Sequence, residues 1–547
     1  MTSTRRHPWF LRPAQPANWK AALLGFGIVE SVGLLVRGLL LWAQPGVWYF
    51  PDSKSYIYAL AYPRETASRP GDIAAFWFHL TFGNYHEHDV VVLQFILGMA
   101  SIGFLYDGLR RITGKVGAIA WTSLYAALPI IAVYERTILS ESLTIDFVVC
   151  FLWATCIAFS CRQWWLRPWF VVVGVASLAA AASIRTALLI PSIVAGLALG
   201  VSWMVLELID KRSILRAATS VVALAASVVV FIAPLEGTLS QNQRVFSMRT
   251  LNVLSGSFLA ARWNTILPCT SSLAKQSDVK AALRQLCHEH DTSQYPGFSM
   301  NLVWVPNTAI FQAGRLGPSL ANDQRELSAI TIAALISHPT AAIGGMTAVA
   351  LDELFGPVFV NVAQYDDGYQ MWVHQGTKQY RQVLLDWSQR SSAPRQNVLP
   401  VFRSIALQTS KIPQALLWLL IAGIVVRLVY FFVIVRRRDD VPVARDPWIA
   451  KSRFGIGVVA SLFLVGNVIG IAATAFASFR YNLVLIAPLI VLLAMTWGRC
   501  PITGSQSASS DDVPLAPDSA SPEGGNAIPE LNLAAADCLA MKSKYSF

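Results

Sequence analysis

Acidic and aromatic residues lie where long apolar runs of the sequence end, and their types suit proton transfer with a hydroxyl group. Asp52 follows the first apolar run, and Tyr56 comes four residues later. Glu141 lies in the turn after the third run. Charged side chains at the ends of membrane spans are costly, so they mark candidate functional sites. Both acids also suit a helix start, where carboxylates accept hydrogen bonds from backbone N–H groups, so both interpretations stay open.

Two arginines lie at other ends of apolar runs and suit the binding of a phosphate. Arg185 separates the fifth run from the sixth, and Arg480 with Tyr481 occupies the very short turn before the last run. A guanidinium offers a planar fork of N–H donors that matches phosphate oxygens. The alternative for Arg185 is an arginine at a lipid interface that extends its charged end into water.

The composition predicts which elements position these residues. Of 547 residues, 54% are hydrophobic and 14% are charged, and the mean hydropathy is +0.48, whereas soluble domains carry about a quarter charged residues. We therefore predict an all-α polytopic membrane protein, which excludes a soluble enzyme, a β-barrel channel and a disordered scaffold. A span needs roughly 20 apolar residues, and we predict about ten spans, within a range of about 10 to 12. The runs cover 20–43, 89–108, 116–134, 142–160, 168–183, 187–206, 217–235, 413–435, 455–477 and 482–497.

The charge pattern predicts the orientation of these spans. Lysine and arginine outnumber aspartate and glutamate by 43 to 32, which gives a net charge of +11. This excess gathers in alternate loops, as the positive-inside rule describes for cytoplasmic loops, so no nucleic-acid partner is predicted. The predicted parts are a cytoplasmic N-terminus (1–19), a transmembrane core (20–235) with a first outer loop (44–88), an extracytoplasmic loop domain (236–412), C-terminal transmembrane helices (413–497) and a disordered cytoplasmic tail (498–547).

The loop domain contains an apolar segment and two cysteines. The apolar stretch within 341–358 ends before Asp352 and Glu353, so we predict a surface-lying or re-entrant helix rather than an eleventh span. Cys269 and Cys287 lie on the predicted outer, oxidising side, where disulfides persist. We predict that they form a disulfide, which would stabilise the fold by roughly 3 kcal/mol; two free thiols are the alternative.

The order and sidedness of these groups resemble the polytopic glycosyltransferases of the GT-C fold, which include protein O-mannosyltransferases and lipid A aminoarabinose transferases. The resemblance rests on Asp-Ser-x-x-Tyr at 52–56, Ser-Glu-x-Leu at 140–143, Arg-Thr at 185–186 and Arg-Tyr at 480–481. It covers residues 20–235 best.

This resemblance implies a GT-C-like fold and an enzyme that moves a sugar from a polyprenyl phosphate to an envelope acceptor, either a lipid, a glycan or a protein. The reaction would invert the anomeric carbon at the extracytoplasmic face of the cell inner membrane. Asp52 would be the catalytic general base. The implied substrate-binding residues are Tyr56, Glu141, Arg185, Arg480 and Tyr481.

The sequence departs from the family pattern in two places. Ser53 stands where a second acid is expected, which leaves Asp52 as the sole carboxylate there. The loop domain at 236–412 matches no motif of the family, and we expect it to set the acceptor.

The tetrapeptide His-Glu-His-Asp occurs at 86–89 and again at 288–291, once in each predicted outer segment. Histidines two residues apart share a face on a strand but not on a helix, and four pooled ligands could bind zinc. We favour a polar surface, because arginines can serve a phosphate leaving group without a metal. No metal site is predicted and no cofactor is required, and a divalent cation is the alternative.

The first span contains two charged residues, and two functions other than glycosyl transfer stay open. Glu30 and Arg37 lie two turns apart in the first span; ionisable groups inside a membrane are functional by default, and contact with another helix is the alternative. A transporter or flippase of a lipid-linked sugar would need polar groups near the middle of the bilayer. A non-catalytic envelope assembly protein would use 236–412 as a binding module.

Overall fold

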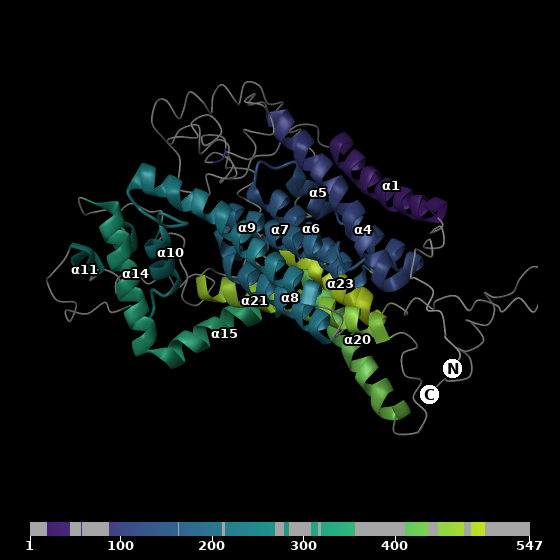
Figure 1. Ribbon diagram of the computed structural model, residues 1–547. Helices are drawn as coiled ribbons and strands as arrows, with labels where there is room; N and C mark the ends of the chain where they lie inside the picture. Colours follow the sequence, from purple (N-terminus) through teal and green to yellow (C-terminus); the bar gives the residue numbers. More distant parts are fainter. Residues whose placement is uncertain are drawn as a thin grey trace, which may run out of the picture. The chain divides into compact units, whose positions relative to one another are not determined.

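The computed structural model describes residues 19–43, 56, 87–161, 163–209, 214–267, 278–283, 303, 308–314, 319–355, 411–435, 447–474 and 483–497. The elements of these ranges are all helices (Figure 1). They are α1 (Trp19–Ala43), α4 (Glu87–Ala126), α5 (Pro129–Glu135), α6 (Ser140–Ser160), α7 (Arg167–Ile184), η1 (Thr186–Leu188), α8 (Leu189–Ile209), α9 (Ile214–Phe246), α10 (Ser255–Arg262), α11 (Asp278–Leu283), α13 (Ala309–Ala313), α14 (Leu320–Ser337), α15 (Pro339–Phe355), α20 (Ile412–Val435), α21 (Pro447–Thr474), η4 (Leu483–Leu485) and α23 (Ile486–Trp497).

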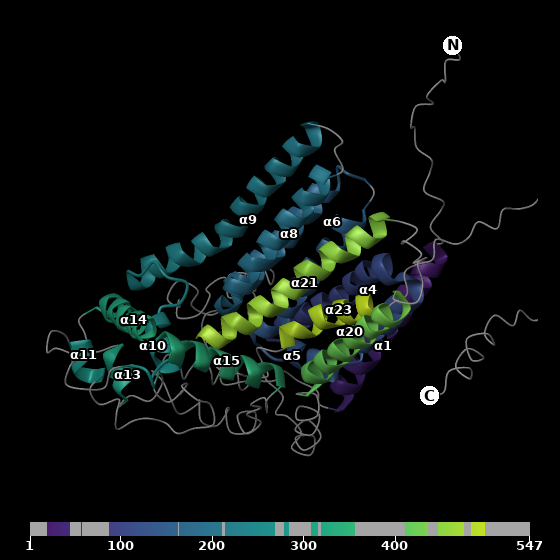
Figure 2. The ribbon, with the colours of Figure 1, turned by 90° about the horizontal axis from the view of Figure 1, so that it is seen from below.

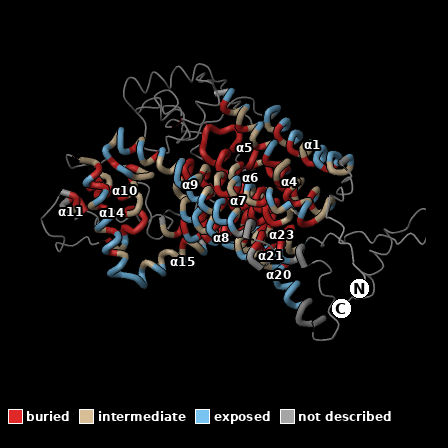
Figure 3. The backbone as a smooth tube through the Cα atoms, in the orientation of Figure 1, coloured by how far each residue is buried: buried red, intermediate tan, exposed pale blue. Residues whose placement is uncertain are grey.

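Helix α6 forms the centre of a helical bundle. In the apolar stretch of α6, 83% of the residues are buried. The buried share of the corresponding stretch is 22% in α1, 17% in α9 and 22% in α20. Figure 3 shows buried residues gathered around α6 and α7, with exposed residues along α1 and α9. A helix whose outward side chains are apolar faces lipid rather than water. The outer helices therefore present their apolar faces to a membrane, and α6 is shielded by them.

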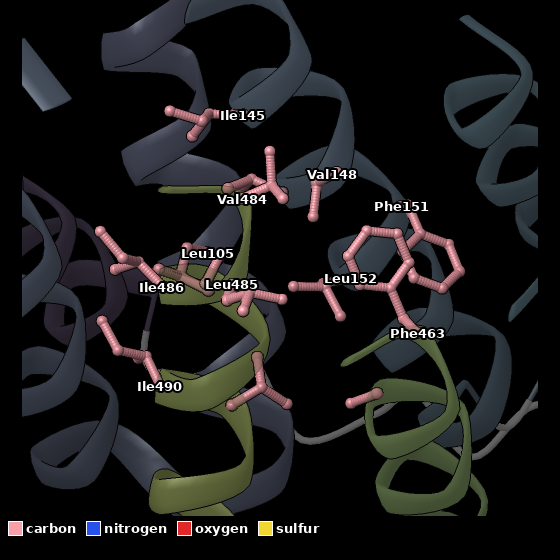
Figure 4. Packing of buried hydrophobic residues seen from close by; sticks show 14 of the residues in the cluster. Leu105, Ile145, Val148, Phe151, Leu152, Phe463, Val484, Leu485, Ile486 and Ile490 are labelled. Atoms are coloured by element: carbon pink, nitrogen blue, oxygen red, sulfur yellow. The ribbon is translucent and has the colours of Figure 1, made fainter. Parts of the chain in front are cut away.

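The core around α6 joins segments that lie far apart in the sequence. Phe151 of α6 lies against Phe463 of α21, with ring centroids 5.8 Å apart. Figure 4 shows Val148 and Leu152 on the same side of α6, facing Val484 and Leu485. The C-terminal helices therefore close the bundle around the N-terminal ones.

Gly114 reverses the direction of the chain inside α4. A straight helix would place residues 98 and 126 about 42 Å apart, and the nine residues from there to Glu135 could reach back only about 32 Å. The Glu135 carboxylate nevertheless lies against Gly98. Gly114 has φ 78° and ψ 178°, a backbone conformation that essentially only glycine adopts. The two arms of α4 therefore run in opposite directions.

The described residues contain eight helices long and apolar enough to cross a membrane, or nine if the bent pair α14–α15 is one span. This supports the predicted polytopic membrane protein but is fewer than the ten predicted spans. The runs at 89–108 and 116–134 fall largely within α4, which counts once despite its reversal. The run at 482–497 forms only Leu483–Trp497, which is short for a span. The predicted tail at 498–547 lies outside the described residues.

Helix α10 attaches the long segment after α9 to the end of α21. The buried Arg262 side chain donates from Nε to the Ala472 carbonyl (3.0 Å) and from Nη2 to the Gly345 carbonyl (2.9 Å). The indole of Trp263 donates to the Ala473 carbonyl at 3.1 Å. The last carbonyls of a helix carry partial negative charge and favour cations. Burial lowers the pKa of Arg262 to about 10, so the side chain stays protonated at neutral pH.

Replacing Gly114 by alanine should destabilise the protein by about 1–3 kcal/mol, because alanine does not tolerate this φ and ψ. The control is Gly27→Ala in α1, where an added methyl meets no atom within 4 Å and alanine favours the helix. The apparent melting temperature in detergent should fall for the first variant and not for the second. Equal melting temperatures would contradict the role assigned to Gly114.

Candidate active site

Three of the predicted substrate-binding residues meet at the N-terminal end of α6. Arg185 Nη1 lies 3.1 Å from Glu141 Oε1. Ser140 Oγ donates to Glu141 Oε2 at 3.1 Å, and the Tyr56 hydroxyl donates to Ser140 Oγ at 3.2 Å. The chain Tyr56–Ser140–Glu141–Arg185 therefore joins three segments of the sequence into one continuous polar group, which we call the α6 polar chain.

The ends of two helices position this chain. Glu141 lies in the first turn of α6, where the helix dipole favours a negative charge. Arg185 follows the last residue of α7 in an extended conformation (φ −137°, ψ 101°), and η1 begins directly after it. The break between α7 and η1 therefore turns the guanidinium back toward the start of α6. The two side chains are only 9% and 0% exposed, and each charge compensates the other in a medium where an isolated charge is costly.

A second ion pair lies in the turn between α5 and α6. Arg37 of α1 donates from Nε to Glu135 Oε2 at 2.7 Å and from Nη2 to Glu135 Oε1, which makes a two-pronged pair. Arg136 Nη1 donates to the Leu40 carbonyl at 2.9 Å. Arg37 therefore contacts another helix, which was one of the two alternatives for it. Glu135 comes from a segment 98 residues away in the sequence, so periodicity within α1 could not have identified it.

Burial strongly affects the proton affinity of Glu135. Burial raises the pKa of the Glu135 carboxyl group to about 7, because burial disfavours the charged form. The charge and hydrogen bonds of Arg37 oppose this effect only in part. A carboxyl group with a pKa near 7 can both hold and release a proton at neutral pH. It therefore has the properties of an acid–base group as well as those of a structural ion pair.

A buried carboxylate that the sequence analysis did not single out lies one and a half turns into α6. Ser101 Oγ of α4 donates to Asp146 Oδ1 at 2.7 Å. Among the described residues Oδ2 of Asp146 has no hydrogen-bond partner. Asp146 also interacts electrostatically with Glu135 and Arg37. Within a long apolar run an acidic residue is itself a signal of function, and Asp146 could have been found in this way.

The remaining predicted site residues fall outside the described residues. These include the general base Asp52, both members of the Arg480-Tyr481 turn, and the disulfide candidates Cys269 and Cys287. The side chains of both His-Glu-His-Asp segments also fall outside the described part of the chain, apart from that of Asp89. In the part of the chain that the structure describes, no group of three or more His, Cys, Asp or Glu residues could hold a metal ion.

Comparison of the chain with protein families, with curated proteins and with solved structures finds no match. The GT-C resemblance therefore rests on the sequence motifs alone.

Breaking the buried pair should cost much more than breaking an exposed one. Glu141→Gln or Arg185→Met alone should lower the free energy of unfolding by about 3–5 kcal/mol, because each leaves a buried charge without its partner. The double variant should regain part of this loss. The matched control is the exposed pair Arg249–Glu236 (2.8 Å), whose removal should cost less than about 1 kcal/mol. Denaturant titration in detergent measures all four quantities, and additive single losses at 141 and 185 would contradict the pairing.

The proton affinity of Glu135 predicts a pH dependence of stability. Its pKa is 4.5 unperturbed and about 7 in the folded protein, so the folded state binds the proton more tightly between these values. The free energy of unfolding should therefore fall as the pH rises from about 5 to about 8. Glu135→Gln mimics the protonated form, and its difference from the natural protein should change over this range. The comparison uses melting temperatures at each pH, and parallel curves would contradict the raised pKa.

Proposed function

We propose that the protein is an integral membrane glycosyltransferase that moves a sugar from a polyprenyl phosphate to an envelope acceptor, with inversion. The observation that carries the proposal is the α6 polar chain. Tyr56, Glu141 and Arg185 belong to separate motifs; Ser140 links Tyr56 to Glu141, and Arg185 lies directly against Glu141. Membrane lipids, the lipid-linked donor and the acceptor are its partners, and no nucleic acid is involved.

The proposed reaction needs a base, a leaving group and a way to stabilise negative charge. The acceptor hydroxyl oxygen attacks the anomeric carbon and gives its proton to Asp52 as the carbon–oxygen bond to the lipid phosphate breaks. The phosphate leaves with the bonding electrons, so its negative charge grows in the transition state. Cationic groups aimed at this charge lower the barrier. A direct displacement without a covalent intermediate inverts the anomeric carbon.

Arg185 is suited to the phosphate because its position is already fixed. In this structure Glu141 compensates its charge at 3.1 Å, so a phosphate would join or replace that carboxylate as partner. A guanidinium accommodates two anionic groups through its fork of donors. Glu141 thus orients the guanidinium before the donor binds, and Arg480 with Tyr481 would approach the same phosphate. Tyr56 is buried and its hydroxyl is fixed by the bond to Ser140, and in the proposed enzyme its ring would contact the sugar or the prenyl chain where these enter the site.

A transporter or flippase of a lipid-linked sugar is the second candidate. It is favoured by the buried groups Arg37, Glu135, Asp146 and Ser101, which lie inside the bundle on four helices. Ionisable groups inside a membrane mark transport pathways or proton relays. The transferase is preferred because the polar chain of Tyr56, Glu141 and Arg185 lies at a helix end rather than along a path through the bundle.

Asp52→Asn should abolish sugar transfer, with a loss of at least about 100-fold, because the amide cannot accept the proton of the acceptor hydroxyl. The assay supplies purified protein with radiolabelled polyprenyl-phospho-sugars and membrane extract. Glu236→Gln, which changes an exposed acid within α9, is the matched control and should keep normal transfer.

The outcomes of this assay separate the two functions. Equal transfer by the natural protein and Asp52→Asn would remove Asp52 from the mechanism. The second arm measures movement of the same lipid-linked sugar across the bilayer of reconstituted vesicles. Movement across the bilayer without transfer to any acceptor would replace the transferase by the flippase.

A further inference from the structure

Helices α14 and α15 contain a long stretch without charge that is bent in its middle. From Leu327 to Leu351 the sequence has no Asp, Glu, Lys or Arg over 25 residues. Such a stretch would span a bilayer if it were straight. The two helices together are long and apolar enough to be a span, but the angle of the bend between them is 100°. Pro339 begins α15 and lacks a backbone N–H, which explains the break at this residue.

The exposed face of α14 changes from polar to apolar toward this bend. Near the start of the helix the exposed residues are Asn322 and Arg325. They are followed on the same side by Ala329, by Ile332 at 49% exposed and by Ile336 at 73% exposed. A protein surface in water has no reason for such a gradient. A surface that leaves water along its length does, because apolar side chains become favourable as water is lost.

Helix α15 continues the apolar surface beyond the bend. One side of α15 packs against the bundle, where Val349 contacts Ala472 of α21. The opposite side exposes Ile343 at 63% and Leu351 at 52%. In Figures 1 and 2 α15 lies beside α21, and Figure 2 shows it crossing near the ends of the bundle helices. The exposed side of α15 thus lies on a helix that packs beside the end of α21, where Val465 (48%) and Ile469 (47%) are exposed apolar residues.

Two exposed hydroxyl groups, one on either side of the bend, are satisfied within their own helices. Ser337 Oγ donates to the Ala333 carbonyl at 2.8 Å, and Thr347 Oγ1 donates to the Ile343 carbonyl at 2.8 Å. Water would satisfy these groups without such bonds, whereas in lipid each polar group must find a partner in the protein. The two bonds thus remove polar groups that would otherwise oppose contact with lipid.

We propose that the bend between α14 and α15 is a membrane-interface anchor that inserts Ile336 and Ile343 into the boundary between the headgroups and acyl chains of the bilayer. Its occupant is lipid, because α15 packs beside α21, a span with exposed apolar residues of its own. An apolar helical surface of this kind is buried about 5–10 Å into the boundary. The anchor holds helices α10, α11, α13 and α14 at the membrane surface. This role does not depend on the proposed glycosyl transfer.

Photocrosslinking in reconstituted vesicles tests the anchor. The full chain carries benzoylphenylalanine at Ile336 or at Ile343, in vesicles of phosphatidylethanolamine and phosphatidylglycerol. Leu419, exposed on α20, is the positive control for contact with lipid, and Asn322 is the matched control on α14 itself. Mass spectrometry should find lipid adducts at both isoleucine positions at about the level of Leu419, and at least tenfold less at Asn322.

Other outcomes would overturn the anchor. Lipid adducts at Ile336 and Ile343 no more frequent than at Asn322 would show that the bend lies in water. Covalent dimers at these positions without lipid adducts would show that a second copy of the chain covers it. Each variant is first compared with the natural protein by melting temperature, and two positions are used so that misfolding of one leaves the other informative.

Discussion

The fold depends on the requirement that charges buried among the helices are compensated by other groups of the protein. A charge taken out of water costs several kcal/mol unless another group compensates it. Three buried glutamates meet this requirement with an arginine from a different helix or turn. The pairs are Arg37–Glu135, Arg185–Glu141 and Arg167–Glu207. They tie α1 to α5, the end of α7 to α6, and the start of α7 to α8, so the electrostatics fix which helices are neighbours.

The same requirement links the candidate chemistry to the fold. Glu141 cannot be removed from the site without taking away the carboxylate that lies against Arg185, because the two side chains are buried together. An anionic substrate would enter an arrangement that already contains both charges, and little reorganisation would be needed as its charge grows. At the same end of the bundle, Trp263 binds the carbonyl of Ala473, seven residues before Arg480 in the sequence. In the proposed enzyme the segment expected to select the acceptor is therefore attached to α21, the helix that precedes Arg480 in the sequence.

Much of the helical architecture, and part of the site, could be predicted from the sequence. The apolar runs located α1, α6, α7, α8, α9, α20 and α21, because a bilayer imposes a minimum length on any helix that crosses it. Placing Tyr56, Glu141 and Arg185 at one membrane face anticipated their meeting. Partners from distant segments could not be predicted. Neither the Arg37–Glu135 pair nor the hydrogen bonds of Arg262 to two carbonyl groups produce a periodic pattern in the sequence. The reversal of the chain at Gly114 could not be predicted either, because a single glycine in an apolar run does not indicate a change in the direction of the helix.

The central place of α6 has a consequence for how the chain enters a membrane during synthesis. An acid near the centre of a lone helix in lipid costs about 2.5–3.5 kcal/mol, and α6 carries Asp146 within its length and Glu141 in its first turn. The arginine that compensates Glu141 is made later, at the end of α7. A translocon that released α6 by itself would expose an uncompensated acid to lipid. Biogenesis therefore favours retaining α6 until α7 has emerged, so that the two helices leave the translocon as one hairpin.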